Sequence, residues 1–135
     1  MLFLSSFLYA KPMVSVSILP QQYFIEKIAG NTLEVNVMVT PGNSPATYEP
    51  KPSQMKSLAQ SKLYFAIGVP FEKVWLPKFE SMAASMQIVF TDENISKRIM
   101  ASHHHENHVR HEGVADPHIW LDPLLVKIQA KTIAK

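Results

Sequence analysis

The sequence contains no cysteine, and this absence excludes disulfide bonds, cysteine-based zinc sites and thiol chemistry. It has only four glycines, and they do not form the pattern that cradles phosphates, so a nucleotide is a poor candidate for a ligand. The formal net charge is only +2 and the basic residues are scattered, which argues against a nucleic-acid partner. Beyond the N-terminus, no segment is apolar and long enough to span a membrane.

The first ten residues, MLFLSSFLYA, are apolar and end on a small residue, like the hydrophobic region and cleavage end of a secretory signal. They are too short for a membrane-spanning helix, which needs about twenty residues. The alternative is an apolar N-terminal arm. We expect residues 1–10 to be a signal peptide without its usual basic start, and the protein to be exported.

The remaining length suits one domain, and hydrophobic periodicity predicts strands alternating with helices. The strands are expected at residues 14–18, 33–39, 63–67 and 87–90. The helices are expected from Pro20 to Gly30, from Pro52, from Phe71 to Met82 with a kink or break at Pro77, and from Pro123.

Apolar side chains at helical spacing are expected to face the core of the protein. They are Phe24, Ile25, Ile28, Met55, Leu58, Ala59, Phe71, Val74, Trp75, Phe79, Met82, Leu124, Leu125 and Ile128.

Strand–helix–strand units of this length make neighbouring strands parallel. We therefore predict an α/β fold with a four-stranded parallel sheet flanked by helices on both faces. Ligands of such sheets bind beyond the carboxyl ends of the strands. The loop at 41–50, Gly68 and the histidine-rich segment each follow a strand, so all three are expected at one edge of the sheet.

All the histidines of the chain lie between positions 103 and 118. Neutral imidazole is the commonest protein ligand for transition metals, so this clustering predicts metal binding. The earlier group is either a metal-binding loop or a polar loop with incidental affinity. His118 is either a ligand or a packed side chain bonded to a backbone carbonyl. The earlier group consists of His103, His104, His105, His108 and His111.

Two longer segments carry a family resemblance. PGNSPATYEPKPSQ at 41–54 is similar to a loop of the zinc and manganese solute-binding proteins of bacterial ABC importers, the ZnuA/TroA-like family. DPHIWLDP at 116–123 resembles the second metal-binding motif of that family. A histidine-rich insertion ahead of this motif is typical of the zinc-specific members. The resemblance covers the chain after its leader and corresponds to the family's first lobe.

This resemblance implies one lobe of a TroA-like two-lobe protein, which captures a divalent metal ion in the periplasm and passes it to a membrane permease. It implies that His118 is a metal ligand and that the loop histidines are auxiliary. The family's other histidine falls at Ala46, which has no donor atom. The remaining ligands would come from a second lobe that is missing from this chain.

Residues 11–122 are thus expected to form the N-terminal metal-binding lobe, with its histidine-rich loop at 102–112, and residues 123–135 to begin the inter-lobe helix. Zinc is the expected metal and manganese the alternative. Tyr48 and Glu49 are expected to be structural, unless one of them replaces the missing imidazole. Asp116 and Asp122 are expected to be a loop residue and a helix cap.

Other functional classes are a periplasmic metal buffer or chaperone, a truncated remnant and a metal-dependent hydrolase. A hydrolase would need three protein ligands, an open coordination position and a placed general base. The spacing from His105 to His108 is one residue short of the metalloprotease pattern. We therefore predict that the chain is not an enzyme.

Overall fold

The computed structural model describes residues 10–100 and 114–135. Nearly all of the expected signal peptide and all five loop histidines lie outside these residues. Among the described residues, no helix has the length and apolar character needed to cross a membrane.

A parallel sheet of four strands organises the fold, in the order β2-β1-β3-β4. In the register, Val16 of β1 pairs with Val37 of β2 on one side and with Phe65 of β3 on the other. The predicted α/β fold with a four-stranded parallel sheet is confirmed. The strands are β1 (Met13–Ile18), β2 (Glu34–Val39), β3 (Leu63–Ala66) and β4 (Gln87–Phe90).

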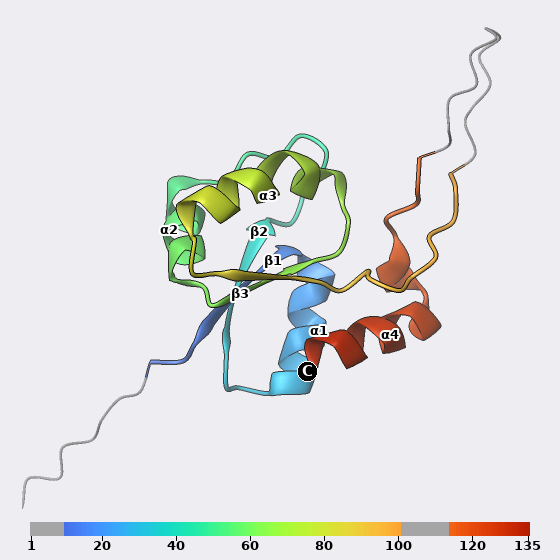
Figure 1. Ribbon diagram of the computed structural model, residues 1–135, viewed down its shortest axis with the longest axis horizontal. Coiled ribbons are helices and arrows are strands. Elements are labelled where there is room, and N and C mark those ends of the chain that lie inside the picture. The colour runs from blue at the N-terminus through green and yellow to red at the C-terminus, as the bar shows by residue number, and fades with distance from the viewer. Residues whose placement is uncertain (1–9, 101–113) are drawn as a thin grey trace, which may run out of the picture.

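Helices cover both faces of the sheet, as Figure 1 shows, with α2 and α3 on one face and α1 and α4 on the other. The α2–α3 side holds a core in which Phe79 packs its ring 5.5 Å from Tyr64 and 5.9 Å from Phe71. A smaller cluster around Ile25 and Phe65 lies on the other face. The helices are α1 (Leu19–Ala29), α2 (Pro52–Gln60), α3 (Pro70–Met82) and α4 (Pro123–Ile133), with a short 3₁₀ turn η1 (Ile119–Leu121) before α4.

Proline, glycine and aspartate set the helix boundaries as the sequence predicts. Pro52 and Pro123 occupy the first positions of α2 and α4, where a missing N–H costs nothing. Gly30 ends α1 with a positive φ of 60° and donates its N–H to Glu26 O at 2.9 Å. The carboxylate of Asp122 accepts the N–H of Leu124 at 2.8 Å, which confirms its role as the cap of α4.

The helix faces were predicted only in part. Ile25, Leu58, Phe71 and Phe79 are buried, and Phe24, Met55, Trp75, Leu125 and Ile128 are partly buried. The prediction is wrong for five side chains that are exposed, and these are Ile28, Ala59, Val74, Met82 and Leu124.

In α1 and α4, a glutamine side chain points into the protein at a position where an apolar residue would be expected. Gln21 is buried because its Oε1 accepts Ser17 N–H at 3.0 Å and its Nε2 donates to Phe65 O at 2.8 Å. The inward row of α1 therefore runs through Gln21 and Ile25, and a count of apolar residues alone misplaces this face.

Pro77 does not divide α3, which runs without interruption from Pro70 to Met82, so a break at this residue is ruled out. The N–H that Pro77 lacks would have bonded the carbonyl of Lys73. Both residues are exposed, so water can bind that carbonyl and offset the loss.

Candidate metal centre

The DPHIWLDP segment is anchored to the protein core and turns sharply at His118. Ile119 buries its side chain in the core on the α2–α3 side. Two backbone bonds close the turn, from Ile119 N to Pro117 O at 2.8 Å and from Leu121 N to His118 O at 3.2 Å. The backbone of His118 is therefore fixed by the residues on either side of it.

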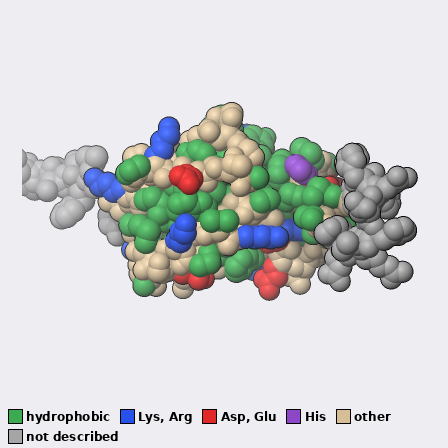
Figure 2. All heavy atoms as spheres, turned by 90° about the horizontal axis from the view of Figure 1, so that it is seen from above, with side chains coloured by type: hydrophobic (Ala, Val, Ile, Leu, Met, Phe, Trp, Pro, Cys, Tyr) green, Lys and Arg blue, Asp and Glu red, His purple; other side chains and the backbone are tan. Residues whose placement is uncertain are grey.

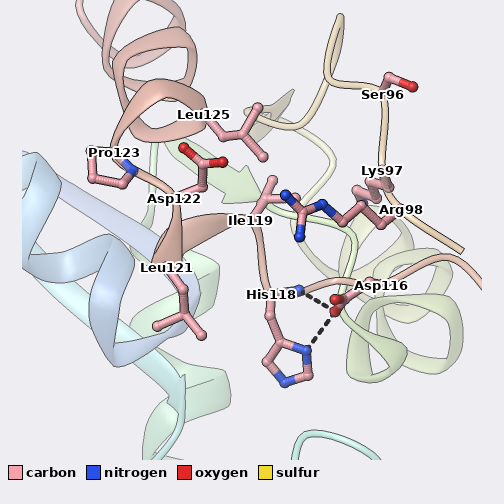
Figure 3. Close-up of a pocket in the computed structure, with 10 residues that line it drawn as sticks. All are labelled: Ser96, Lys97, Arg98, Asp116, His118, Ile119, Leu121, Asp122, Pro123 and Leu125. Carbon is pink, nitrogen blue, oxygen red and sulfur yellow. Dashed lines mark hydrogen bonds and ion pairs between the residues drawn. The ribbon is translucent and has the colours of Figure 1, made fainter. Parts of the chain in front are cut away.

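Asp116 holds both the backbone and the ring of His118. Its Oδ1 accepts the His118 N–H at 3.0 Å and lies 2.6 Å from the ring Nδ1 (Figure 3). These bonds, the backbone one first, lower the pKa of the Asp116 carboxyl below its ordinary value. Because an ionised carboxylate only accepts hydrogen bonds, the neutral ring carries its proton on Nδ1, and Nε2 keeps a free lone pair.

Among the described residues, no group bonds Nε2 of His118, which is therefore open to a ligand. Its side chain is 54% exposed, and its ring lies 5.0 Å from that of Trp120. In Figure 3 the ring projects away from α4, with Nε2 turned from Asp116. In the space-filling view the imidazole lies at the surface beside apolar side chains (Figure 2).

His118 lines a pocket of about 710 Å³. The walls include two cationic side chains, Lys97 and Arg98, and the carboxylates of Asp116 and Asp122. The other lining residues are Ser96, Ile119, Leu121, Pro123 and Leu125.

The donor set in the described residues fits one metal–ligand bond rather than a complete site. His118 is the only histidine at positions 10–100 and 114–135. Within the same ranges, no group of three or more histidine, aspartate or glutamate side chains could enclose a metal ion. An imidazole fixed by a carboxylate is nevertheless the usual arrangement of a zinc-bound histidine. A tetrahedral site would need further ligands from elsewhere.

A short antiparallel ribbon lies directly before Asp116, and the sequence analysis missed it. Ile99 and Ala115 form the bridge, Met100 N donates to Val114 O at 2.9 Å, and Asp116 N donates to Arg98 O at 2.7 Å. The ribbon thus joins the two ends of the segment that contains the five other histidines, and it ends at Asp116.

Ala46 and His118 do not line the same pocket. Ala46 lines one of about 250 Å³ together with Glu49, Trp75 and others. The bond from Tyr48 N to Ser44 O, at 3.1 Å, curls this loop. Tyr48 is buried and donates its hydroxyl to Gln54 Oε1 at 2.8 Å, which agrees with the structural role expected for it.

A buried polar cluster lies beneath the carboxyl edge of the sheet. Glu72 accepts the N–H groups of Ile67 at 2.9 Å and of Gly68 at 2.7 Å, and it also accepts the hydroxyl of Ser17. Ser17 lies 2.7 Å from the hydroxyl of Tyr64. Burial raises the pKa of Glu72 and, above all, that of Tyr64. The cluster joins the ends of β1 and β3 to the start of α3.

Gly68 brings the backbone close to an ion pair. Its φ is +83°, and a Cβ there would lie 2.0 Å from Lys97 Nζ and 2.5 Å from Asp92 Oδ2. Lys97 is 2.5 Å from Asp92 and also donates to Ile67 O at 3.2 Å. The backbone at Gly68 therefore lies closer to this ion pair than a residue with a Cβ would allow.

Comparison with known proteins shows which family this chain belongs to. The model of a family described as "ZnuA: Zinc-uptake complex component A periplasmic" matches residues 14–135. The chain belongs to this family. The family resemblance predicted from the two sequence segments is confirmed.

Other members of the ZnuA family agree with this assignment. A crystal structure of ZnuA has 43% sequence identity and a TM-score of 0.78, over 92% of this chain and 45% of that one. A putative metal-binding protein of Chlamydia muridarum is 32% identical over 90% of this chain and 41% of its own length. The high-affinity zinc uptake system protein ZnuA of Yersinia pestis is 26% identical over 98% of this chain and 48% of its own length. The chain therefore spans less than half the length of these relatives.

Asp116 makes contacts that the sequence analysis did not predict. It was expected to be only a loop residue, whereas it fixes the ring of the candidate ligand. The signal available in the sequence was the Asp-Pro-His spacing, in which proline restricts the backbone between the two side chains.

Proposed function

We propose that this chain is the first metal-binding lobe of the solute-binding component of a zinc ABC importer. The lobe takes up a divalent metal ion and, with the rest of the protein, passes it to a membrane permease. The observation that carries the proposal is the Asp116–His118 pair, which leaves Nε2 free and open at the surface. Family membership over residues 14–135 supports it.

His118 is the proposed metal ligand, and Asp116 is its orienting partner. A hydrogen bond from Nδ1 to a carboxylate fixes the ring and makes Nε2 a better donor. A nitrogen ligand suits zinc, whereas manganese prefers oxygen ligands. Relatives are named for both metals, as the zinc uptake protein of Bacillus subtilis and the manganese-binding lipoprotein of Halalkalibacterium halodurans illustrate. Zinc is therefore the proposed cargo, with manganese as the alternative.

The other parts of the proposal follow the family. The protein is exported and works on the outer side of the membrane that holds its permease. Further ligands come from a second lobe, for which the relatives have more than half of their length outside the matched region. The histidines from His103 to His111 act as auxiliary binders that collect ions with lower affinity. The function is transport, without catalysis.

Zinc titration of two variants tests the proposal. His118→Ala removes the oriented ligand and should abolish the best-defined site while leaving weaker ions bound. Replacing the five loop histidines by asparagine should remove weak ions and leave the defined site, since a polar loop loses conformational entropy around each ion it orders. Calorimetry and native mass spectrometry count the ions in each case. Identical titration curves for the two variants would contradict the proposed roles.

A further inference from the structure

The one side chain that helix α4 buries completely is polar. Gln129 has no exposed surface, and its Nε2 donates to the carbonyl of Ile119 over a long 3.4 Å. Its Oε1 has no hydrogen-bond partner among the residues that the structure describes. A buried acceptor without a donor is unfavourable, so the position calls for an explanation other than packing.

The carbonyl that Gln129 contacts belongs to the residue directly after His118. In a regular helix, the carbonyl of Ile119 would be bonded by the N–H group four residues later, which is Pro123. Proline has no N–H, so this bond cannot form. The side chain of Gln129 reaches back from the second turn of α4 and supplies the missing donor.

We propose that Gln129 is a positioning residue for the metal ligand His118, an inference that rests on the proposed function of His118. Asp116 fixes the ring and the N–H of His118, and Gln129 bonds the carbonyl of Ile119, the next residue along the chain. Together they hold the imidazole before metal arrives. A ligand that is held in advance loses less conformational freedom on binding.

Zinc titration of the full chain labelled with ¹⁵N-histidine tests the inference. The ring signals of His118 are those that His118→Ala removes, so this site can be followed apart from the other histidines. In Gln129→Met we expect the zinc midpoint of these signals to weaken about three- to tenfold, the equivalent of one ordinary hydrogen bond. Thermal stability should be about unchanged, because the substitution removes the unpaired Gln129 acceptor but also leaves the Ile119 carbonyl without this donor.

The combination of weaker zinc binding and undiminished stability separates positioning from packing. Gln60→Met is the matched control, because Gln60 lies exposed on α2, and it should change neither property. If methionine unfolds the chain, Gln129→Leu is the second apolar replacement.

Two outcomes would overturn different claims. A zinc midpoint of His118 within about twofold of the parent in the folded Gln129 variant would overturn the positioning role and leave the proposed function standing. His118 signals that do not respond to zinc in the parent protein would overturn the proposed function itself.

Discussion

Gly68→Ala should destabilise the lobe by two separable effects. The first is backbone strain, since a φ of +83° costs a residue with a Cβ about 1 kcal/mol or more. The second is a clash, because the new Cβ would lie 2.0 Å from Lys97 Nζ. The ammonium must move, and it then loses its bonds to Asp92 and to the carbonyl of Ile67.

The clash should add to the strain through the bonds that the displaced ammonium loses. Hydrogen bonds to charged groups contribute about 1.5–3 kcal/mol, and the side chains of this pair are only 15% and 19% exposed. We therefore expect Gly68→Ala to lower the free energy of unfolding by about 2.5–4 kcal/mol. Gly42→Ala is the matched control, because Gly42 has a φ of +82° and nothing within 4 Å of its Cβ position. It should cost only the strain.

Urea denaturation followed by circular dichroism at pH 7 gives both free energies. A third measurement isolates the ion pair, because on a background with both Lys97→Ala and Asp92→Ala the Gly68→Ala substitution should cost about as much as Gly42→Ala. Equal losses from Gly68→Ala and Gly42→Ala in the parent chain would refute the clash. A large loss that persists without the ion pair would show that another contact limits the space.

Three further predictions concern titration and the metal ligand. Burial raises the pKa of Glu72 from 4.5, so the folded chain holds this proton more tightly than the unfolded chain, and stability falls as pH rises from 4.5 towards the folded-state pKa. Denaturation of Glu72→Gln at several pH values should show a flatter dependence of stability on pH. The variant also leaves one backbone N–H without an acceptor, which should lower the free energy of unfolding by about 1–3 kcal/mol at pH 5. A slope like that of the parent would assign the titration to another group. Asp116→Ala should weaken zinc binding about tenfold in dye competition with the five loop histidines replaced by asparagine, and an unchanged affinity would deny it the orienting role. Zinc affinity should drop as imidazole gains protons at about pH 6–7, so equal affinity at about pH 7.5 and 5.5 would direct attention to carboxylates.

The sheet was predictable because its signals are local. Strands are indicated by alternating apolar residues and by the continuous apolar run at Leu63–Ala66, and Gly42 and Gly68 mark where two of them end. None of these signals needs long-range information. The helix faces were less predictable. Gln21 and Gln129 occupy inward positions, and only the tertiary structure shows which backbone groups their amides bond.

The candidate site was predictable as a sequence motif but not as a geometry. His118 was identified from the eight residues around it, while its hydrogen bonds with Asp116 depend on a turn that a pattern of apolar residues does not encode. The same limit applies to Ala46. The order of strands places its loop at the carboxyl edge of the sheet, but it does not predict the hydrogen bond from Tyr48 to Ser44 that shapes the loop.

The ribbon that pairs Ile99 with Ala115 means that the segment between them can change in sequence and length without disturbing the rest of the fold. The ends of this segment are joined by backbone bonds that use no particular side chain, so an insert can be exchanged while Arg98 and Asp116 keep their separation. For a flexible insert, each doubling of length adds only about 0.6 kcal/mol of closure entropy. On the proposed function, a change in the number of histidines in this segment would alter how many ions the protein binds weakly and would leave Asp116 and His118 in place.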